Sequence, residues 1–269
     1  LGLDRSDQIV AVGGGSVTDF AGFLAATWLR GISWVAIPTS LAGMVDAAIG
    51  GKTGINGAFG KNLIGSFHSP SKVLIDISFL ASLTDRDFNA GLAEVIKSGL
   101  IKDLRILDLL QNESTRSLRN KDEKILELIF RAIRVKAEIV SEDFRESGVR
   151  AFLNYGHTLG HAVERACGYQ LRHGEAVSVG LFFAAHLSHR LTGLSTKARD
   201  QHQALLTSFD LPIKFESGAF AGVLELMKKD KKRSNGILRF VLLEELGKPE
   251  LVDVADERLL ESLYQEVMR

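Results

Sequence analysis

Residues 8–31 read QIVAVGGGSVTDFAGFLAATWLRG, and this stretch decides the fold class. Residues 8–12 form a short apolar run that ends at three glycines, which is typical of a buried strand entering a tight turn. Ser16, with Asp19 three residues later, fits a capping box at the start of a helix. Apolar residues at helical spacing follow, and Gly31 is placed to end the helix. The stretch therefore predicts a strand, a glycine turn and a helix.

Two more short strands are predicted, over residues 34–37 and 73–75. Strands that alternate with a helix favour a parallel α/β sheet. Doubly wound sheets usually have about five or six strands, so we expect this domain to be cut short at its N-terminus. The chain also starts at Leu1, with no methionine before Met44.

Helical spacing dominates from about Thr84 onward. A long apolar stripe runs over residues 125–140, and further helices are predicted over 156–166 and 174–190. A turn at 234–236 precedes an apolar run that we predict to be one arm of a hairpin. The chain is therefore predicted to hold a truncated α/β, Rossmann-like parallel-sheet domain followed by a mainly helical domain, with a cleft between them. The predicted bounds are residues 1–83 and 84–269.

Composition excludes several classes of protein. The 269 residues carry 33 Lys plus Arg against 33 Asp plus Glu, and 45% are hydrophobic, which excludes a disordered chain. Zero net charge argues against nucleic acid or an anionic membrane as the main partner. The single cysteine, Cys167, excludes an internal disulfide framework and fits a reducing compartment, so we expect a cytoplasmic protein. The most apolar stretch, residues 176–187, is too short to span a bilayer.

Two glycine-rich segments are candidates for binding anions. Gly13-Gly14-Gly15-Ser16 lies between a strand and a helix, where backbone N–H groups can hold a phosphate. It is not GxGxxG, and a simple tight turn is the alternative. Residues 50–65 hold six glycines with Lys52 and Lys61. They fail the P-loop pattern, and we expect them not to be regular helix or strand throughout. Their lysines could cradle an anion, or the segment could be a solvated flexible loop.

Three histidines lie close together in the sequence. His157 and His161 share one helical face and could meet one metal ion, and His173 follows shortly after. Glu94, surrounded by apolar residues, is the best candidate for the carboxylate of a His₂Glu catalytic site. A lone histidine would more often have a structural role, but the cluster favours a metal site.

Lys136 interrupts an otherwise apolar helical stripe. Its amine either snorkels to water or points into the cleft toward an anionic substrate. The basic run at 228–233 is usually a solvated face, although one of its lysines could reach a phosphate in the cleft.

Six runs, in this order, resemble the 3-dehydroquinate synthase family: GGGSVTDFAGFLAATWLRG, IPTSLAGMVDAAIGGKTGIN, GKNLIGSFHSP, AGLAEVIKSGLI, LNYGHTLGHAVE and HGEAVSVGL. The resemblance covers about Gln8 to Leu243. It implies conversion of 3-deoxy-D-arabino-heptulosonate 7-phosphate to 3-dehydroquinate and phosphate in the shikimate pathway. It also implies bound NAD⁺ and a divalent metal, zinc or otherwise cobalt.

The resemblance also implies a role for each matching residue. The metal ligands would be Glu94, His157 and His173, while His161 would act nearby through hydrogen bonding or proton transfer. The residues that hold the substrate would be Asp46, Lys52, Asn62, Lys97, Lys136, Arg150, Asn154 and one of Lys231 or Lys232. The residues that contact NAD would be Gly13, Gly14, Gly15, Ser16, Asp19, Thr39, Lys61 and Thr84. Arg30 resembles an arginine that reaches a neighbouring subunit's phosphate pocket, which implies a homodimer.

The sequence departs from the family pattern in one respect. Family members carry a further strand-and-helix block before the glycine turn, so we expect this chain to be a fragment. The closest rival family is another sugar-phosphate cyclase, such as a 2-deoxy-scyllo-inosose or valiolone synthase. Lys136 and the Arg150–Asn154 spacing favour a carboxylated substrate and hence dehydroquinate synthase. The chain could also be a metal-dependent polyol dehydrogenase, or a non-catalytic remnant that binds metal or substrate.

Overall fold

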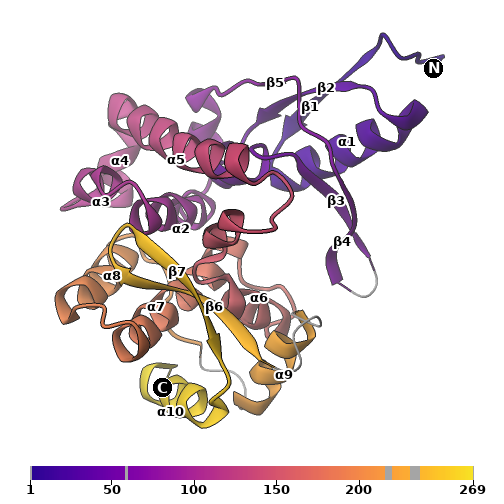
Figure 1. Cartoon of the computed structure of the whole chain (residues 1–269). Coiled ribbons are helices and arrows are strands. Elements are labelled where there is room, and N and C mark those ends of the chain that lie inside the picture. The colour runs from indigo at the N-terminus through magenta and orange to yellow at the C-terminus, as the bar shows by residue number, and fades with distance from the viewer. Residues whose placement is uncertain (1, 58–59, 216–219, 231–236, 269) are drawn as a thin grey trace.

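The N-terminal part of the chain is built on a three-stranded parallel sheet (Figure 1). Its strands β1 (Gln8–Gly13), β2 (Ser33–Pro38) and β5 (Lys72–Val73) lie in the order β1-β2-β5. Val10 of β1 pairs with Val35 of β2, and all pairings in this sheet are parallel. The three predicted strands are confirmed. This computed structural model describes residues 2–57, 60–215, 220–230 and 237–268.

Helix α1 (Gly15–Thr27) and the 3₁₀ turn η1 (Trp28–Arg30) connect the first two strands. The predicted capping box is wrong, because the N-cap position is Gly14 and no side chain caps the helix. Gly14 turns the chain into the helix two residues earlier than expected, so Ser16 lies within the first turn. Gly31 follows the 3₁₀ turn with a φ of 120°, a conformation that favours glycine.

The glycine-rich segment after the π-helical turn η2 (Gly43–Ala47) forms an antiparallel hairpin, β3 (Lys52–Gly57) and β4 (Gly60–Phe67). This hairpin was not predicted from the sequence, although the segment is not regular throughout, since Gly50 and Gly51 precede β3 and the register shifts between Ile55 and Gly57. Gly54 pairs with Gly65 across the hairpin, and a Cβ at Gly65 would lie 2.3 Å from the carbonyl oxygen of Thr53. Glycine is needed here because the two backbones approach so closely.

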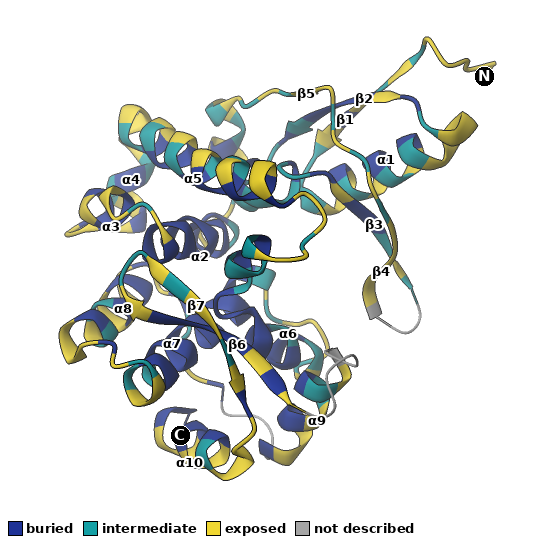
Figure 2. Ribbon diagram, viewed as in Figure 1, coloured by how far each residue is buried: buried dark blue, intermediate teal, exposed yellow. Residues whose placement is uncertain are grey.

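The rest of the chain is mainly helical, and Figure 2 shows α2 and α7 as its buried centre. The helices and turns are η3 (Ile77–Ser82), α2 (Asp85–Ile101), α3 (Arg105–Leu110), α4 (Thr115–Arg119), α5 (Asp122–Glu142), η4 (Val149–Asn154), α6 (His157–Ala166), α7 (His173–Leu191), α8 (Thr196–Ser208), α9 (Phe220–Asp230) and α10 (Glu257–Met268). A hairpin of β6 (Leu238–Glu245) and β7 (Lys248–Val254) covers one side.

The helices predicted over 125–140, 156–166 and 174–190 are confirmed, and so is the hairpin arm. The predicted turn at 234–236 lies outside the described residues, as do Lys231 and Lys232. The chain is thus a mixed α/β protein with a parallel-sheet N-terminal region followed by a helical region.

Two apolar clusters hold the fold together. The large one fills the helical region and includes Leu41 and Met44 from the segment after β2. The small one lies between α1 and the sheet around Trp34. Because the segment after β2 belongs to the large cluster, the strand ends are fixed against the helical region. This junction is where the cavity described below opens.

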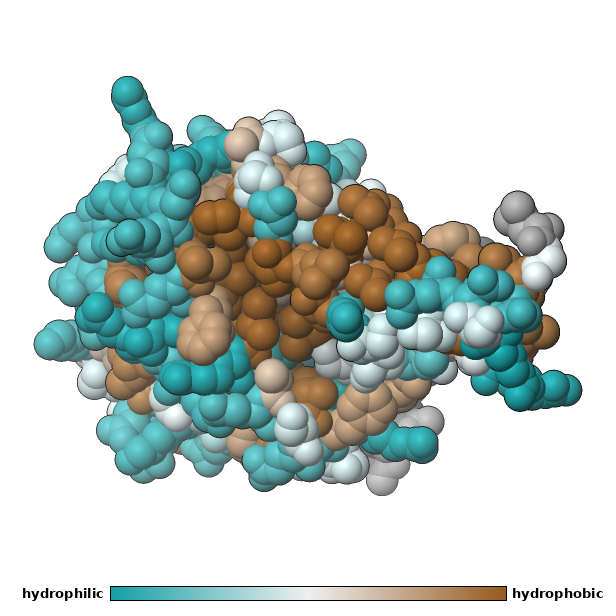
Figure 3. All heavy atoms as spheres, turned by 90° about the horizontal axis from the view of Figure 1, so that it is seen from above, coloured by the Kyte–Doolittle hydropathy of each residue, from teal (hydrophilic) through white to brown (hydrophobic). Residues whose placement is uncertain are grey.

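Apolar side chains also gather on the outer face of β1 and α1 (Figure 3). Val10 and Val12 of β1 are exposed on either side of the buried Ala11, and Val17, Phe20 and Leu24 form an exposed stripe on α1. Within the described residues, no helix is long and apolar enough to cross a membrane.

Candidate active site

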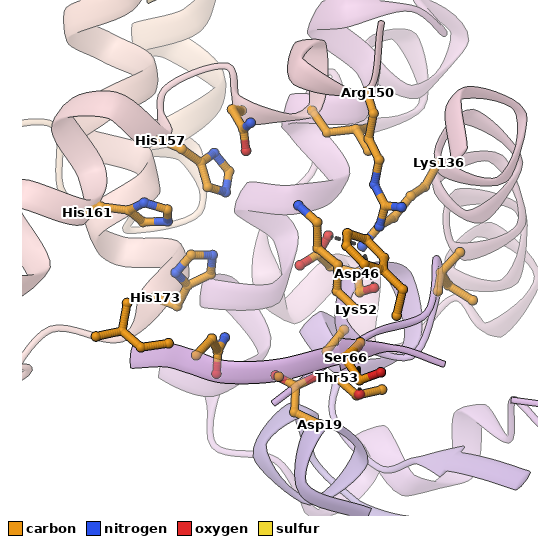
Figure 4. Close-up of a pocket in the computed structure, with 18 of the residues that line it drawn as sticks. Asp19, Asp46, Lys52, Thr53, Ser66, Lys136, Arg150, His157, His161 and His173 are labelled. Carbon is orange, nitrogen blue, oxygen red and sulfur yellow. Dashed lines mark hydrogen bonds and ion pairs between the residues drawn. The ribbon is translucent and has the colours of Figure 1, made fainter. Parts of the chain in front are cut away.

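A cavity of about 550 Å³ opens between the β3–β4 hairpin and helices α5, α6 and α7 (Figure 4). Eleven of the residues predicted for the site line it. They are Asp19, Asp46, Lys52, Asn62, Lys97, Lys136, Arg150, Asn154, His157, His161 and His173. The fold therefore brings together residues from both halves of the chain.

Three potential metal ligands converge from three helices. Glu94 lies in the middle of α2, whereas His157 and His173 are the first residues of α6 and α7. Oε1 of Glu94 is 3.5 Å from Nε2 of His157 and 3.3 Å from Nε2 of His173. One ligand atom from each residue falls within 4.8 Å of the others. A single ion could contact all three.

Glycines make this convergence possible. Gly156 has a φ of 80°, and a Cβ there would lie 2.8 Å from the backbone nitrogen of Leu181. A Cβ at Gly174 would lie 1.8 Å from the carbonyl oxygen of Ala90 in α2. Without a side chain at Gly174, the first turn of α7 rests directly on α2, so His173 reaches Glu94.

The donor set fits a divalent cation. Glu94 is 2% exposed, and its Oε2 forms an ion pair with Lys97, although neither carboxylate oxygen accepts a hydrogen bond from the described residues. Burial alone would raise the pKa of Glu94, but the charge of Lys97 and contacts with His157 hold it well below its usual range. Lys97 balances the charge at Oε2, while Oε1 faces the two imidazoles, so the three groups form a His₂Glu set that suits a divalent cation.

His157 has the protonation state that a metal ligand needs. Burial, reinforced by the charge of Lys97, lowers its pKa to about 4. Nδ1 of His157 is 3.1 Å from the carbonyl oxygen of Tyr155, so this nitrogen carries the proton and Nε2 is left to face Glu94. The neutral ring is therefore held with its free lone pair toward the possible metal position.

His161 lies beside this group without belonging to it. Its ring centroid is 5.2 Å from that of His157 and 6.0 Å from that of His173. The pairing of His157 with His161, inferred from helical spacing alone, is thus replaced by the grouping with His173 that the resemblance implies. His161 still lines the cavity next to the metal candidates.

Cationic side chains form the facing wall, as Figure 4 shows for Lys136, Arg150 and Lys52. Lys136 is buried, forms an ion pair with Asp46 and donates to the Asp46 carbonyl oxygen. Burial lowers the pKa of Lys136, although the Asp46 carboxylate opposes this effect. Lys136 therefore points into the cavity rather than snorkelling to water.

Arg150 is the most deeply buried cation among the described residues, at 1% exposed. Nη2 donates to the carbonyl oxygen of Gly50 at 2.8 Å, and Nη1 donates to that of Phe144. Its backbone N–H donates to Asp143, whose pKa falls to about 2 because it accepts several backbone hydrogen bonds. The guanidinium pairs with no carboxylate among the described residues, so its charge is available to the cavity.

The residues assigned to NAD lie in three places. Gly13, Gly14, Gly15, Ser16 and Thr39 lie at the ends of β1 and β2, where the Thr39 N–H donates to the Gly13 carbonyl at 2.9 Å. Only Asp19 of the set lines the cavity, where burial, aided by the Asp46 charge, raises its pKa to about 7.

The remaining two residues of that set lie elsewhere. Lys61 forms an ion pair with Glu164, and Thr84 is the N-cap of α2, accepting a hydrogen bond from the Asp87 N–H at 3.1 Å. The Thr84 hydroxyl is therefore engaged in starting the helix.

Two carboxylates at the site were not predicted. Glu146 accepts a hydrogen bond from Asn154 Nδ2 at 2.6 Å and pairs with Lys52. Glu164, on α6, lies beside His173. The only sequence signal for Glu164 is its spacing from His157 and His161, which places it on the same helical face. No pattern in the chain points to Glu146.

The chain resembles one family in sequence throughout. A model described as "3-dehydroquinate synthase N-terminal" matches residues 1–90, and one described as "3-dehydroquinate synthase C-terminal" matches residues 91–233. A 3-dehydroquinate synthase from Paenarthrobacter aurescens is 52% identical over 263 residues, which cover 98% of this chain and 72% of the relative. A 3-dehydroquinate synthase from Mycolicibacterium vanbaalenii is 50% identical over 269 residues, which cover 100% of this chain and 75% of the relative.

Solved structures extend the likeness to related cyclases. A 2-epi-5-epi-valiolone synthase from Streptomyces hygroscopicus with NAD⁺ and Zn²⁺ bound matches with a TM-score of 0.92 and 30% identity, over 99% of this chain and 75% of that one. A 2-deoxy-scyllo-inosose synthase complexed with carbaglucose-6-phosphate, NAD⁺ and Co²⁺ matches with a TM-score of 0.85 and 28% identity, over 98% of this chain and 75% of that one. A probable glycerol dehydrogenase from Sinorhizobium meliloti matches with a TM-score of 0.66 and 15% identity, over 97% of this chain and 76% of that one. At this identity the likeness shows a shared fold alone.

Proposed function

This chain belongs to the 3-dehydroquinate synthase family, and on that premise we propose that its cavity converts 3-deoxy-D-arabino-heptulosonate 7-phosphate to 3-dehydroquinate and phosphate. The observation that carries the proposal is the meeting of Glu94, His157 and His173 opposite a cationic wall. A metal site facing buried positive charges suits a substrate that has hydroxyl, carboxylate and phosphate groups.

We propose that Glu94, His157 and His173 hold a zinc ion, with cobalt as the alternative, and that NAD⁺ lies over the turn between β1 and α1. When bound, the metal acidifies a substrate hydroxyl and NAD⁺ takes up and later returns a hydride, so no net oxidation results. The residues proposed to contact NAD⁺ are Gly13, Gly14, Gly15, Ser16, Asp19, Thr39, Lys61 and Thr84. The NAD⁺ and metal named for two similar solved cyclases support this assignment.

The chain's own residues bind and orient the substrate. Lys52, Lys97 and Arg150 would attract its phosphate and carboxylate, and their fixed charges would stabilise the leaving phosphate. Asn62 and Asn154 offer amide groups to its hydroxyls. The pair of Lys136 and Asp46 sets one ammonium and one carboxylate at a defined place in the cavity wall. His161, beside the proposed ligands, would hold or pass a proton.

Dehydroquinate synthase is favoured over the related cyclases for two reasons. Identity is about 50% to named 3-dehydroquinate synthases, against 30% and 28% to the two cyclases above. In addition, Lys136 and the Arg150–Asn154 spacing suit a carboxylated substrate, which calls for cationic groups beyond those that hold its phosphate.

Incubation with the heptulosonate phosphate, NAD⁺ and Zn²⁺ tests this function. Phosphate release is followed by a colorimetric assay, and the product is identified by NMR. The proposal expects 3-dehydroquinate in amounts equal to the phosphate released. Phosphate with a different cyclic product would move the assignment to a sister cyclase. Zinc binding without NAD⁺ binding or turnover would indicate a non-catalytic remnant.

We further propose that the α/β domain spans residues 1–83 and the helical domain residues 84–269, and that the active form is a homodimer. In the dimer, Arg30 would reach the neighbouring subunit's phosphate pocket. Arg30 is exposed, has a φ of 69° and forms no ion pair within the part of the chain that is described. An outward-pointing arginine without a counter-charge is free to serve a second subunit.

A further inference from the structure

Glu164 lies buried between two basic groups that come from distant parts of the chain. It is 3% exposed on α6. Its Oε2 is 3.6 Å from Nδ1 of His173, and its Oε1 pairs with the ammonium group of Lys61 on β4. The other ring nitrogen of His173 faces Glu94 at 3.3 Å. The imidazole of His173 therefore lies between two carboxylates.

Lys61 is held at this place by a second contact. Its Nζ lies 4.7 Å from the ring centroid of Tyr169, within the range of a cation–π interaction. Tyr169 is itself fixed to the end of α6, because its N–H donates to the carbonyl oxygen of Glu164 at 2.9 Å. The Glu164 carboxylate and the Tyr169 ring thus bind the Lys61 ammonium group from two sides. These two contacts connect the β3–β4 hairpin to the end of α6.

A histidine that binds a metal through one nitrogen is usually oriented by an acceptor at the other nitrogen. Glu164 is placed to be that acceptor for His173. The ammonium group of Lys61 pairs with the other oxygen of this carboxylate and supplies a counter-charge for it. A charged acceptor fixes the ring more strongly than a neutral one.

We propose that Glu164 is a positioning residue that orients His173 with one oxygen and anchors the β3–β4 hairpin through Lys61 with the other. The inference rests on the proposed function, since it takes His173 to be a metal ligand. The hairpin carries Lys52 and Asn62 into the cavity, so one carboxylate aligns the metal centre and a substrate-binding wall together.

Three variants separate the two roles. E164Q keeps the shape of the side chain but removes its charge. K61M releases the hairpin and leaves the carboxylate beside His173. E113Q is the matched control, because Glu113 is also a buried, lysine-paired carboxylate but does not line the cavity. Zinc affinity is measured by competition with a chromogenic chelator, and hairpin mobility by hydrogen exchange of the β3 and β4 amides.

The proposal expects E164Q to weaken zinc binding about 10- to 100-fold and to speed exchange in the hairpin. K61M should speed exchange in the hairpin while zinc affinity stays within about threefold of the wild type. E113Q should change neither zinc affinity nor hydrogen exchange in the hairpin. The K61M result tests the hairpin link even where E164Q folds poorly, because Lys61 lies on an exposed hairpin strand.

Two outcomes would overturn the inference. One is unchanged zinc affinity in E164Q together with its loss in H173A, which leaves the proposed metal site intact. The other is unchanged hairpin exchange in K61M. Unchanged zinc affinity in H173A would instead contradict the proposed function.

Discussion

Nε2 of His173 lies 3.3 Å from Oε1 of Glu94, although the first residue begins helix α7 and the second lies in the middle of α2. Gly174 makes the contact possible, since α7 could not rest on the Ala90 carbonyl with a larger residue there. The proposed group of metal ligands thus depends on how α7 packs on α2 as well as on which residues are present.

Replacing His173 should abolish metal binding and activity together. H173A removes one of the three proposed protein ligands, so we expect zinc affinity to fall by at least about 100-fold and turnover to fall with it. H161A is the matched comparison, because His161 lies 6.0 Å away by ring centroid. It should keep its zinc while turnover falls about 10²- to 10⁴-fold. Metal analysis and phosphate release measure the two effects, and zinc loss in H161A would refute the division of roles.

The Lys136–Asp46 pair should show strong energetic coupling. K136M or D46N alone leaves one partner in the cavity wall without its counter-charge, so each should lower the free energy of unfolding by about 2–3 kcal/mol. The double variant should recover most of this stability but no activity, since the ammonium group is gone. Urea denaturation of all four proteins measures the coupling. Additive effects of the two substitutions would show that the pair does not act as a unit.

Arg30 can be tested by mixing two inactive proteins. R30A lacks the proposed intersubunit contact and H173A lacks a metal ligand, so each homodimer should be inactive. Mixed dimers contain one site with both residues intact, and random reassociation should restore about a quarter of wild-type activity. The readout is phosphate release after joint refolding. No recovery in demonstrably mixed dimers would contradict a contribution of Arg30 to the neighbouring site.

Stability should fall as the pH drops from about 6.5 to 4. His202 is fully buried, accepts a hydrogen bond from the Tyr155 hydroxyl at 2.9 Å, and has its pKa lowered to about 4 by burial. Its contribution is present above the unfolded pKa of about 6.5 and is lost as the pH falls toward 4, because the unfolded chain gains a proton first.

H202Q provides the control for this pH effect, since glutamine can keep a hydrogen bond to Tyr155 but does not titrate. Urea denaturation between pH 4 and pH 7 should show a shallower pH dependence in H202Q than in the wild type. Parallel curves would show that His202 is not responsible.

The helices and strands around the site were predictable where one residue pattern decides the structure. The period of the apolar residues in α5, α6 and α7 predicts each helix, and the glycine turn predicts the β1–α1 unit. The hairpin was missed because six glycines in sixteen residues hide the pairing of Gly54 with Gly65. That pairing is stabilised by packing on α1, where Gly22 leaves room for Thr53.

From the sequence, only those site residues that lie within the family motifs could be assigned a role. His157, His173 and Glu94 stand in recognisable runs, so the resemblance names them as metal ligands, and the structure brings them together. Glu164 was missed, because its partners Lys61 and His173 become neighbours only in the folded chain. Spacing alone paired His157 with His161, because it cannot show that α7 brings His173 closer to Glu94.

We propose that one zinc ion, held by Glu94, His157 and His173, is required for this chain to form 3-dehydroquinate. Zn²⁺ is titrated into metal-free protein with NAD⁺ and the heptulosonate phosphate, and the initial rate of 3-dehydroquinate formation is recorded. The rate should rise linearly to about one zinc per chain and then level off. Full activity in the metal-free protein, or no product at saturating zinc and NAD⁺, would contradict it.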